Sequence, residues 1–304
     1  MNVALLSGGG GGARFARGLH DVLGPGELTV IGNVGDDEEI LGLHISPDLD
    51  SLLYALAGLI DEERGWGRAD ETWRTLASAA EWGGEDWFRL GDLDLGLHLV
   101  RTRALREGRS LSQVTHDLCA QAGLDTNILP ATDDRLRTLV VTAAGTFAFQ
   151  EWFVGCGHRD EVDAVEYEGA EEARSAPGVL DVLEGADVLL LAPSNPYLSI
   201  GPILAVRAIR DAIERRGIRC VAISPLVGGA AVTGPAGRML SRMAGGTSPA
   251  HVAQSYKGLV DALVIDEADA PAAASVELVV TKTLMRDPES ARRLAEVALG
   301  AACG

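Results

Sequence analysis

Four aspartates that could hold a metal ion fall within fifteen residues of one another: Asp36, Asp37, Asp48 and Asp50. They belong to the stretch IGNVGDDEEILGLHISPDLDS, residues 31–51, which begins as an apolar, strand-like run and continues among the glycines and prolines of loops. Carboxylate oxygens are the ligands that a hard divalent cation prefers, so the cluster predicts a site for such a cation. The alternative is that Asp48 or Asp50 only caps a helix that begins near Leu52.

A glycine loop follows the first apolar run of the chain. Residues 2–6 (NVALL) precede Ser7 and the five glycines at 8–12, and a helical pattern continues through Leu23. Strand, glycine turn and helix form the first unit of a Rossmann-like sheet, and the free N–H groups there favour an anion. The alternative is a tight turn that merely packs the helix against the sheet. An NAD-dependent oxidoreductase is disfavoured, because no acidic residue after the second predicted strand, residues 28–31, is placed to bind a ribose.

Two later apolar runs also end in small polar residues. Residues 187–191 (DVLLL) and 219–223 (RCVAI) are typical of parallel strands that are buried on both faces. Ser194, Asn195 and Ser199 follow the first run, and Ser224 follows the second. Ligands of open α/β sheets bind outside the carboxyl ends of strands, so these side chains are candidates for substrate binding.

Residues 65–125 are almost wholly helical in pattern, and we interpret them as a helical insertion on an α/β scaffold. A helix is expected from about Asp70, and the tryptophans of this region are expected to form an aromatic core: Trp73, Trp82 and Trp87, with Phe88. His98 and Arg101 share one face of a later helix, where Arg101 could meet a phosphate. The alternative for this pair is a solvated helix face.

The remaining segments complete a single α/β domain over residues 1–304. Residues 138–142 and 146–154 predict a β-hairpin, and Asp133 and Asp134 before it are either ligands or turn formers. Further strands are expected at residues 262–265 and 276–280, before a closing helix. The predicted fold is therefore a Rossmann-like, three-layer α/β/α arrangement with a mostly parallel sheet and a helical insertion.

Composition excludes several classes of protein. A formal net charge of −18 argues against nucleic-acid binding, which normally needs a basic face. No stretch reaches the ~18 apolar residues of a membrane span, and no signal peptide is evident, so the cytoplasm is expected. The four cysteines show no paired spacing with one another or with histidine, which argues against a zinc site or a disulfide framework.

Taken in order, several long blocks of the chain resemble the 2-phospho-L-lactate transferase family of coenzyme F420 biosynthesis. The blocks are GGGGGARFARGL (8–19), NVGDD (33–37), HISPDLDS (44–51), RGWGRADETW (64–73), WFRLGDLDLGLHLVR (87–101), LSQVT (111–115), ILPATDD (128–134), APSNPYLSIGPIL (192–204) and SPLVGGAAVTGPAGRM (224–239). Arg14 stands where some members have lysine, which leans towards the actinobacterial phosphoenolpyruvate type. Ser51 replaces the usual threonine and keeps its hydroxyl.

The resemblance implies a Mg²⁺-dependent transferase. Such an enzyme moves a phosphoenolpyruvyl or 2-phospholactyl group from a guanylyl-diphosphate donor to the hydroxyl of the deazaflavin Fo, and it releases GMP. Its partners are these small molecules, with no nucleic acid and no membrane, and a homodimer is expected. The alternative is a nucleotide-sugar-binding regulatory protein of the same fold without transferase activity.

The implied site combines the residues of the strand ends. Asp36 and Asp50 are the expected catalytic carboxylates, and Asp36, Asp37, Asp48 and Asp50 are the expected Mg²⁺ ligands. The expected substrate-binding residues are Ser7, Gly8, Gly9, Gly11, Gly12, Arg14, Asn33, Asp92, His98, Ser194, Asn195, Ser199, Ser224 and Gly228.

Overall fold

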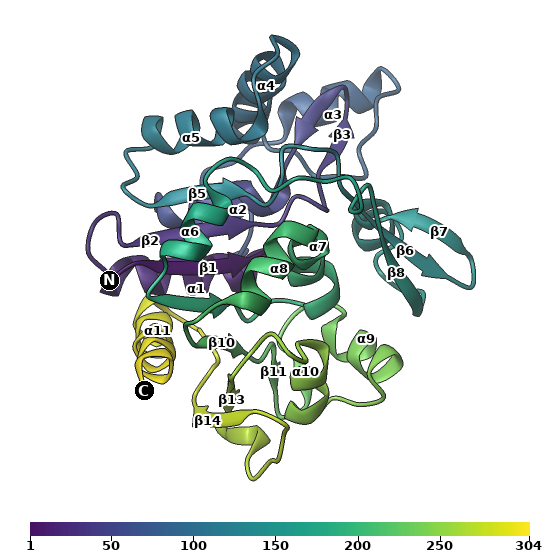
Figure 1. Cartoon of the computed structure of the whole chain (residues 1–304). Helices are drawn as coiled ribbons and strands as arrows, with labels where there is room; N and C mark the ends of the chain where they lie inside the picture. Colours follow the sequence, from purple (N-terminus) through teal and green to yellow (C-terminus); the bar gives the residue numbers. More distant parts are fainter.

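A seven-stranded parallel sheet forms the centre of the computed structural model, which describes residues 1–304 (Figure 1). The strand order is β14-β13-β10-β9-β1-β2-β5, and all neighbours are parallel. The strands are β1 (Val3–Ser7), β2 (Leu28–Gly32), β5 (Asn127–Pro130), β9 (Val188–Leu191), β10 (Cys220–Ile223), β13 (Ala262–Asp266) and β14 (Glu277–Thr281). The chain adds β2 and β5 on one side of β1, then crosses over and adds β9, β10, β13 and β14 on the other. This reversal leaves a crevice outside the carboxyl ends of β1 and β9, where such sheets bind ligands.

Helices cover both faces of the sheet. One face packs against α1 (Gly9–Val22), α2 (Pro47–Leu56), α5 (Leu111–Gln121) and α11 (Pro288–Cys303). The other packs against α6 (Val179–Gly185), α7 (Gly201–Ala205), α8 (Arg207–Arg215) and α10 (Pro249–Ser255). Successive β1 side chains enter opposite cores: Val3 and Leu5 the first, Ala4 and Leu6 the second. The predicted three-layer α/β/α fold is confirmed.

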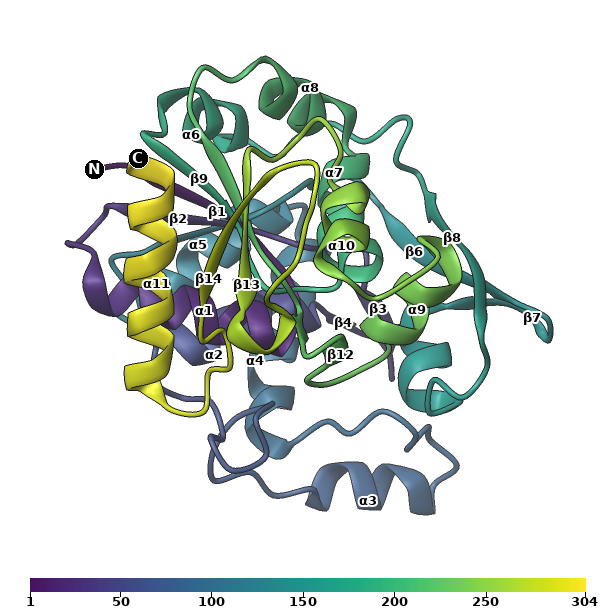
Figure 2. The ribbon, with the colours of Figure 1, turned by 90° about the horizontal axis from the view of Figure 1, so that it is seen from below.

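The helices of residues 65–125 are α3 (Arg74–Glu81), α4 (Asp92–Arg106) and α5. Figure 2 shows α3 projecting away from the body of the molecule. The prediction of an aromatic core is wrong for Trp82, whose exposed fraction is 89% at the end of this projecting helix. Trp87 and Phe88 do make an edge-to-face pair beside a small cluster that includes Leu90.

Smaller elements border the sheet. The predicted hairpin is present as β6 (Arg137–Thr142) and β7 (Gly145–Ala148), and β8 (Val162–Glu168) adds a third antiparallel strand. The second strand ends earlier than predicted, because Glu151–Gly155 is a π-helix that buries Trp152 against Val140 and Leu198. The other elements are the hairpins β3 (Glu38–Ile40) with β4 (Leu43–Ile45) and β11 (Leu226–Val227) with β12 (Ala230–Ala231), the π-helix η2 (Pro196–Ile200), α9 (Ala236–Met243) and the 3₁₀ turn η3 (Glu267–Asp269). None of the helices is long and apolar enough to cross a membrane.

Candidate active site

A cavity of about 650 Å³ opens at the carboxyl ends of the central strands, where the chain reverses direction. Its wall draws on the loops after β1, β9 and β10, on α2 and α4, and on the segment that joins α2 to α3. The residues predicted to bind substrate or metal that line it are Gly8, Gly9, Gly11, Arg14, Asp36, Asp48, Asp50, His98, Ser194, Asn195, Ser199 and Ser224.

The glycine loop allows a close approach between β1 and the acidic segment. A Cβ atom on Gly8 would lie 2.6 Å from Asp48 Oδ2 and 2.9 Å from Ser199 Cβ, so only glycine fits. The next residue, Gly9, has φ of +70° and begins α1, and its N–H donates to Asp48 Oδ1 at 2.7 Å. The loop therefore holds the Asp48 carboxylate at the start of the helix instead of leaving a bare anion site.

Asp36 and Asp48 form a pair of buried carboxylates, each only 6% exposed. Burial raises the pKa of Asp48 to about 6, although hydrogen bonds from Asn33 and Gly9 oppose the rise. Burial and the neighbouring Asp48 charge raise the pKa of Asp36 well above its usual range. Asp36 Oδ1 has no hydrogen-bond partner. Two carboxylates that lack a compensating cation are held together at the wall of the cavity, and a bound cation would stabilise them.

Asp50 is in a different environment, because the buried Arg101 neutralises its charge. Arg101 is 1% exposed and its Nη1 donates to Asp50 Oδ2 at 3.0 Å, while Nη2 donates to Oδ1. This corrects the expectation that Arg101 faces solvent or a phosphate. His98 Nδ1 lies 3.7 Å from Asp50 Oδ2, and burial lowers the pKa of His98 to about 4, so its ring is neutral at pH 7.

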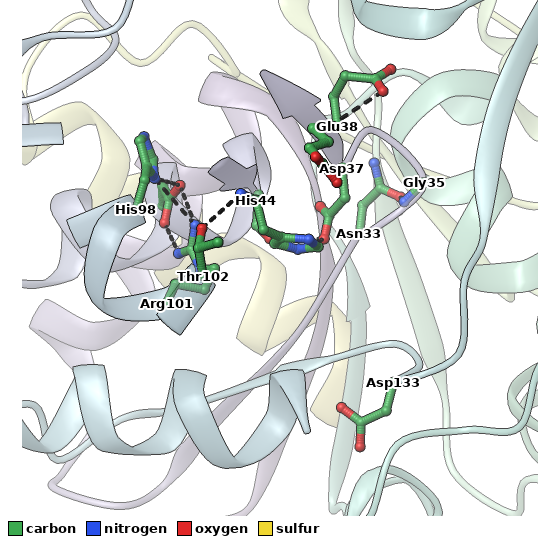
Figure 3. A network of polar contacts seen from close by, with 12 residues as sticks. Asn33, Gly35, Asp37, Glu38, His44, His98, Arg101, Thr102 and Asp133 are labelled. Carbon is green, nitrogen blue, oxygen red and sulfur yellow. Dashed lines mark hydrogen bonds and ion pairs between the residues drawn. The ribbon is translucent and has the colours of Figure 1, made fainter. Parts of the chain in front are cut away.

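Asp37 turns away from the cavity and does not line it. Its Oδ2 accepts hydrogen bonds from Ser46 Oγ at 2.7 Å and from His44 Nε2 at 3.1 Å. Thr102 Oγ1 in turn accepts from the backbone N–H of His44 at 2.8 Å, which ties this network to α4 (Figure 3). Asp37 therefore fixes the β3–β4 hairpin, and its expected role as a metal ligand does not fit this position.

Several other predicted residues also lie outside the cavity lining. Asp92 sits at the start of α4 and accepts the N–H of Thr75 at 3.0 Å, and hydrogen bonding, chiefly from Thr72, lowers its pKa to about 2. Gly228 donates its N–H to Asp269 at 3.2 Å. These contacts show a structural use for both residues, which adjoin the cavity at Val227 and at Leu90 and Asp94 but do not line it.

Three buried residues support the site from behind. Asn33 Nδ2 donates to Asp48 Oδ2 at 2.9 Å, and Asn33 Oδ1 accepts from Gly35 N at 2.8 Å. Ser7 and Gly12 are in contact, since a Cβ on Gly12 would collide with Ser7 Oγ. These residues position the loop and Asp48 and do not reach the cavity.

The opposite wall comes from the loops after β9 and β10. Ser194 Oγ donates to the carbonyl of Gly8 at 2.7 Å, so it closes the glycine loop against β9. Asn195 Oδ1 accepts from Tyr197 N at 2.9 Å and begins η2. Ser224 Oγ accepts from Leu226 N at 3.2 Å. The amide group of Asn195 and the hydroxyls keep further hydrogen-bonding capacity towards the cavity that they line.

Sequence reasoning missed much of the lining. Many of the missed residues are aromatic, apolar or cationic, and Asp94 and Gln150 are polar ones; the set includes Tyr54, Arg64, Trp66, Arg89, Phe149, Phe153 and Met285. They come from segments between 54 and 285 that only the fold brings together. The tryptophan-rich stretch was a visible signal, but its pattern suggested a core and not a cavity wall.

The donor set decides which cation the cavity suits. No three His, Cys, Asp or Glu side chains converge as a ready metal cage. Asp36 and Asp48 nevertheless offer two carboxylates, one with an unpartnered oxygen. Mg²⁺ is commonly held by one or two carboxylates together with waters and substrate phosphates, so this pair fits that ion.

Comparison with known proteins identifies the family. The family model for 2-phospho-L-lactate transferase CofD matches residues 3–294. The chain belongs to the CofD family. This membership confirms the resemblance seen in the sequence and the prediction of an enzyme of the transferase class.

Relatives of this CofD-family chain match along its length. It is similar to the phosphoenolpyruvate transferase of Kitasatospora aureofaciens, with 44% identity over 99% of this chain and 98% of that protein. The phosphoenolpyruvate transferase of Streptomyces coelicolor is 42% identical over 98% and 97% of the two chains. A solved structure of a UPF0052 member from Bacillus halodurans has a TM-score of 0.65 and 16% identity, covering 98% of both chains. That likeness shows the fold alone.

Proposed function

We propose that the protein transfers a phosphoenolpyruvyl group from a guanylyl-diphosphate donor to the hydroxyl of the deazaflavin Fo, releases GMP and depends on Mg²⁺. The observation that carries the proposal is the uncompensated pair Asp36 and Asp48 in a cavity at the topological switch point. The relatives are named phosphoenolpyruvate transferases, which favours an enolpyruvyl over a 2-phospholactyl donor.

Asp36 and Asp48 are the proposed Mg²⁺ ligands, with substrate phosphates and water as the remaining ligands. When bound, the ion would neutralise part of the negative charge that develops on the leaving phosphate and on the transferred group. Asp50 is left out of this ligand set because Arg101 already neutralises it.

The chain's own side chains bind and orient the reactants. Arg14 stands one turn into α1, lines the cavity beside the glycine loop and has no carboxylate partner, so it is suited to bind the donor's anionic oxygens. Asp50, held by Arg101, accepts a hydrogen bond from the attacking hydroxyl and aims it. Neutral His98 keeps this corner free of additional positive charge.

The reaction exchanges one bond to phosphorus for another. The acceptor hydroxyl oxygen forms a bond to the donor phosphorus that carries the three-carbon acid, and the phosphoanhydride bond to GMP breaks. The hydroxyl proton passes to Asp50, which accepts the hydrogen bond of that hydroxyl, and then to water. The products are the phosphodiester of the deazaflavin, GMP and one proton.

The wider setting of the proposal follows from charge and family. An acidic chain of this kind acts on small molecules in the cytoplasm, without nucleic acid or membrane, and we expect a homodimer. An acidic chain can bind an anionic donor here because Arg14, Arg64 and Arg89 line the cavity and a bound Mg²⁺ would add positive charge.

A single assay tests the proposal. Purified protein is incubated with Mg²⁺, Fo and either guanylyl-diphospho-enolpyruvate or the lactyl analogue, and the products are analysed by mass spectrometry. We expect the phosphodiester of Fo and GMP, faster with the enolpyruvyl donor. Absence of product with both donors, together with tight binding of a nucleotide-sugar, would support the regulatory alternative instead.

A further inference from the structure

Residues 61–73, which we call the strap, join α2 to α3 and contribute Arg64 to Gly67 to the cavity wall. The strap is firmly folded. Ile60 forms an antiparallel bridge with Arg68, Asp61 N donates to Gly67 O at 3.0 Å, and Gly65 N donates to Asp61 O at 2.8 Å. It also lies against the glycine loop, since a Cβ on Gly10 would be 3.5 Å from the Gly65 carbonyl.

Alternating tryptophan and arginine side chains form a ladder that ends at the cavity. The Arg64 guanidinium lies over both Trp66 and Trp73, at 5.3 and 5.0 Å from the ring centroids, and Arg89 lies over Trp73 at 5.1 Å. Asp61 holds Arg64 Nη2 at 3.0 Å, and the same nitrogen donates to the carbonyl of Arg68 at 2.6 Å. Stacked cations restrict the rings on which they lie, so the ladder is ordered before any ligand arrives.

Trp66 is the ring at the end of this ladder. It lines the cavity and remains 46% exposed, while Arg64 occupies one of its faces. A large aromatic ring held half open in a concave, partly polar site is the usual form of a platform for a flat ligand. Trp82 in the same region is 89% exposed and outside the cavity, so exposure alone does not distinguish Trp66.

We infer that Trp66 stacks on the planar heteroaromatic ring of a substrate and that Arg64 positions it. This inference rests on the proposed function, because both proposed substrates carry such a ring: guanine in the donor and the deazaflavin in the acceptor. Their shared chemistry is a flat, polar π-system, and stacking on an aromatic side chain suits either of them.

Equilibrium binding tests the inference without turnover. Binding of Fo is followed by its own fluorescence and binding of GDP by calorimetry, each with wild type, Trp66→Ala, Trp66→Phe and Trp82→Ala. We expect Trp66→Ala to raise the Kd of one ligand roughly tenfold or more, as loss of one stacked base does. Trp66→Phe keeps most of the affinity, Trp82→Ala changes it less than about twofold, and thermal melting checks that each variant is folded.

The outcomes show which substrate stacks on Trp66, and they distinguish failure of the stacking inference from failure of the proposed function. Loss confined to Fo assigns the platform to the acceptor, and loss confined to GDP assigns it to the donor. Equal affinities of wild type and Trp66→Ala for both ligands overturn the inference, as does an equal loss in Trp66→Phe. If wild type binds neither ligand, the proposed function itself fails.

The positioning role of Arg64 has a separate readout. Arg64→Ala is expected to weaken the same ligand by less than Trp66→Ala does, and to add nothing when both changes are combined. Additive losses in the double variant would contradict positioning through Trp66 and would place Arg64 in direct contact with the ligand.

Discussion

Two hollows of almost equal volume lie at opposite edges of the same sheet, about 650 Å³ at the carboxyl ends of the strands and about 640 Å³ at the amino ends. The amino-end hollow is lined almost wholly by charged residues and glycines, with one apolar side chain: Glu214, Arg216, Gly217, Arg219, Gly258, Asp261, Glu277 and Ile218. Every carboxylate there has an arginine partner. Arg216 holds Asp261 at 2.7 Å, and Arg219 holds Glu277.

The carboxyl-end cavity differs in leaving charges unsatisfied. Asp36 and Asp48 repel each other and have no arginine or lysine partner, and Arg14 and Arg89 line the cavity without a carboxylate partner. The two hollows have similar volumes, but the carboxyl-end cavity also has many more lining residues, among them aromatic and apolar side chains, and its charges are paired differently. The comparison teaches that a binding site is indicated by charges the fold leaves unpaired, because the folded protein tolerates their cost only where a ligand compensates it.

The largest effect is expected from breaking the one buried ion pair inside the active cavity. Arg101→Met leaves Asp50 buried without a partner and should lower the free energy of unfolding by about 3–5 kcal/mol. Arg219→Met breaks an exposed pair at the other edge and should cost less than about 1 kcal/mol. Urea unfolding at pH 7 measures both, and similar losses in the two variants would remove this distinction.

The room for a Cβ atom at two glycines, one beside each hollow, gives a second contrast. A methyl group at Gly8 would meet Asp48 Oδ2 at 2.6 Å, whereas a Cβ at Gly217 has nothing within 4 Å. Gly8→Ala should displace Asp48 and reduce kcat/KM by about 10²-fold, because small misplacements of catalytic groups have effects of that order. Gly217→Ala should leave the rate unchanged. Steady-state kinetics of Fo consumption compare the two, and a fully active Gly8→Ala would show that Asp48 need not stay in place.

The smallest effect concerns pH and the stability of the metal-free protein. The unfolded chain releases aspartate protons near pH 4, whereas the folded protein holds those of Asp48 and Asp36 to higher pH. Stability therefore falls as pH rises from about 4 through about 6 and beyond. Asp36→Asn should raise stability at pH 8 by on the order of 1 kcal/mol, with a smaller gain at pH 5. Thermal melts with a chelator present measure this difference, and destabilisation at pH 8 would contradict it.

The mostly parallel sheet could be predicted because its strands carry strong local patterns. Val188–Leu191 and Cys220–Ile223 are short apolar runs that no exposed element would carry, and small polar residues mark their ends. The π-helix at Glu151–Gly155 could not be predicted, since its residues favour strands. Burial of Trp152 against distant Val140 overrides that local preference.

The site was predictable only in part, because contacts between residues far apart in the sequence also decide its chemistry. Asp36 and Asp48 each follow a strand, and their residue type and spacing alone are enough to predict a cation site there. The partner that neutralises Asp50 lies 51 residues away on another helix, so the sequence does not show that Asp50 and Asp48 differ. Trp66 was visible but ambiguous, because a tryptophan pattern predicts a core as readily as a cavity wall.

The most direct test of the account compares turnover after neutralising one carboxylate in each hollow. Product formation from Fo and the guanylylated donor is measured at saturating Mg²⁺ for wild type, Asp36→Asn and Asp261→Asn. Asp36→Asn should lower kcat at least about 10²-fold, because removing a metal ligand costs more activity than removing a residue that only supports a ligand. Asp261→Asn should stay within about twofold of wild type. Wild-type turnover in Asp36→Asn that is still abolished by chelation would contradict the assignment of the unpaired carboxylates as the cation site.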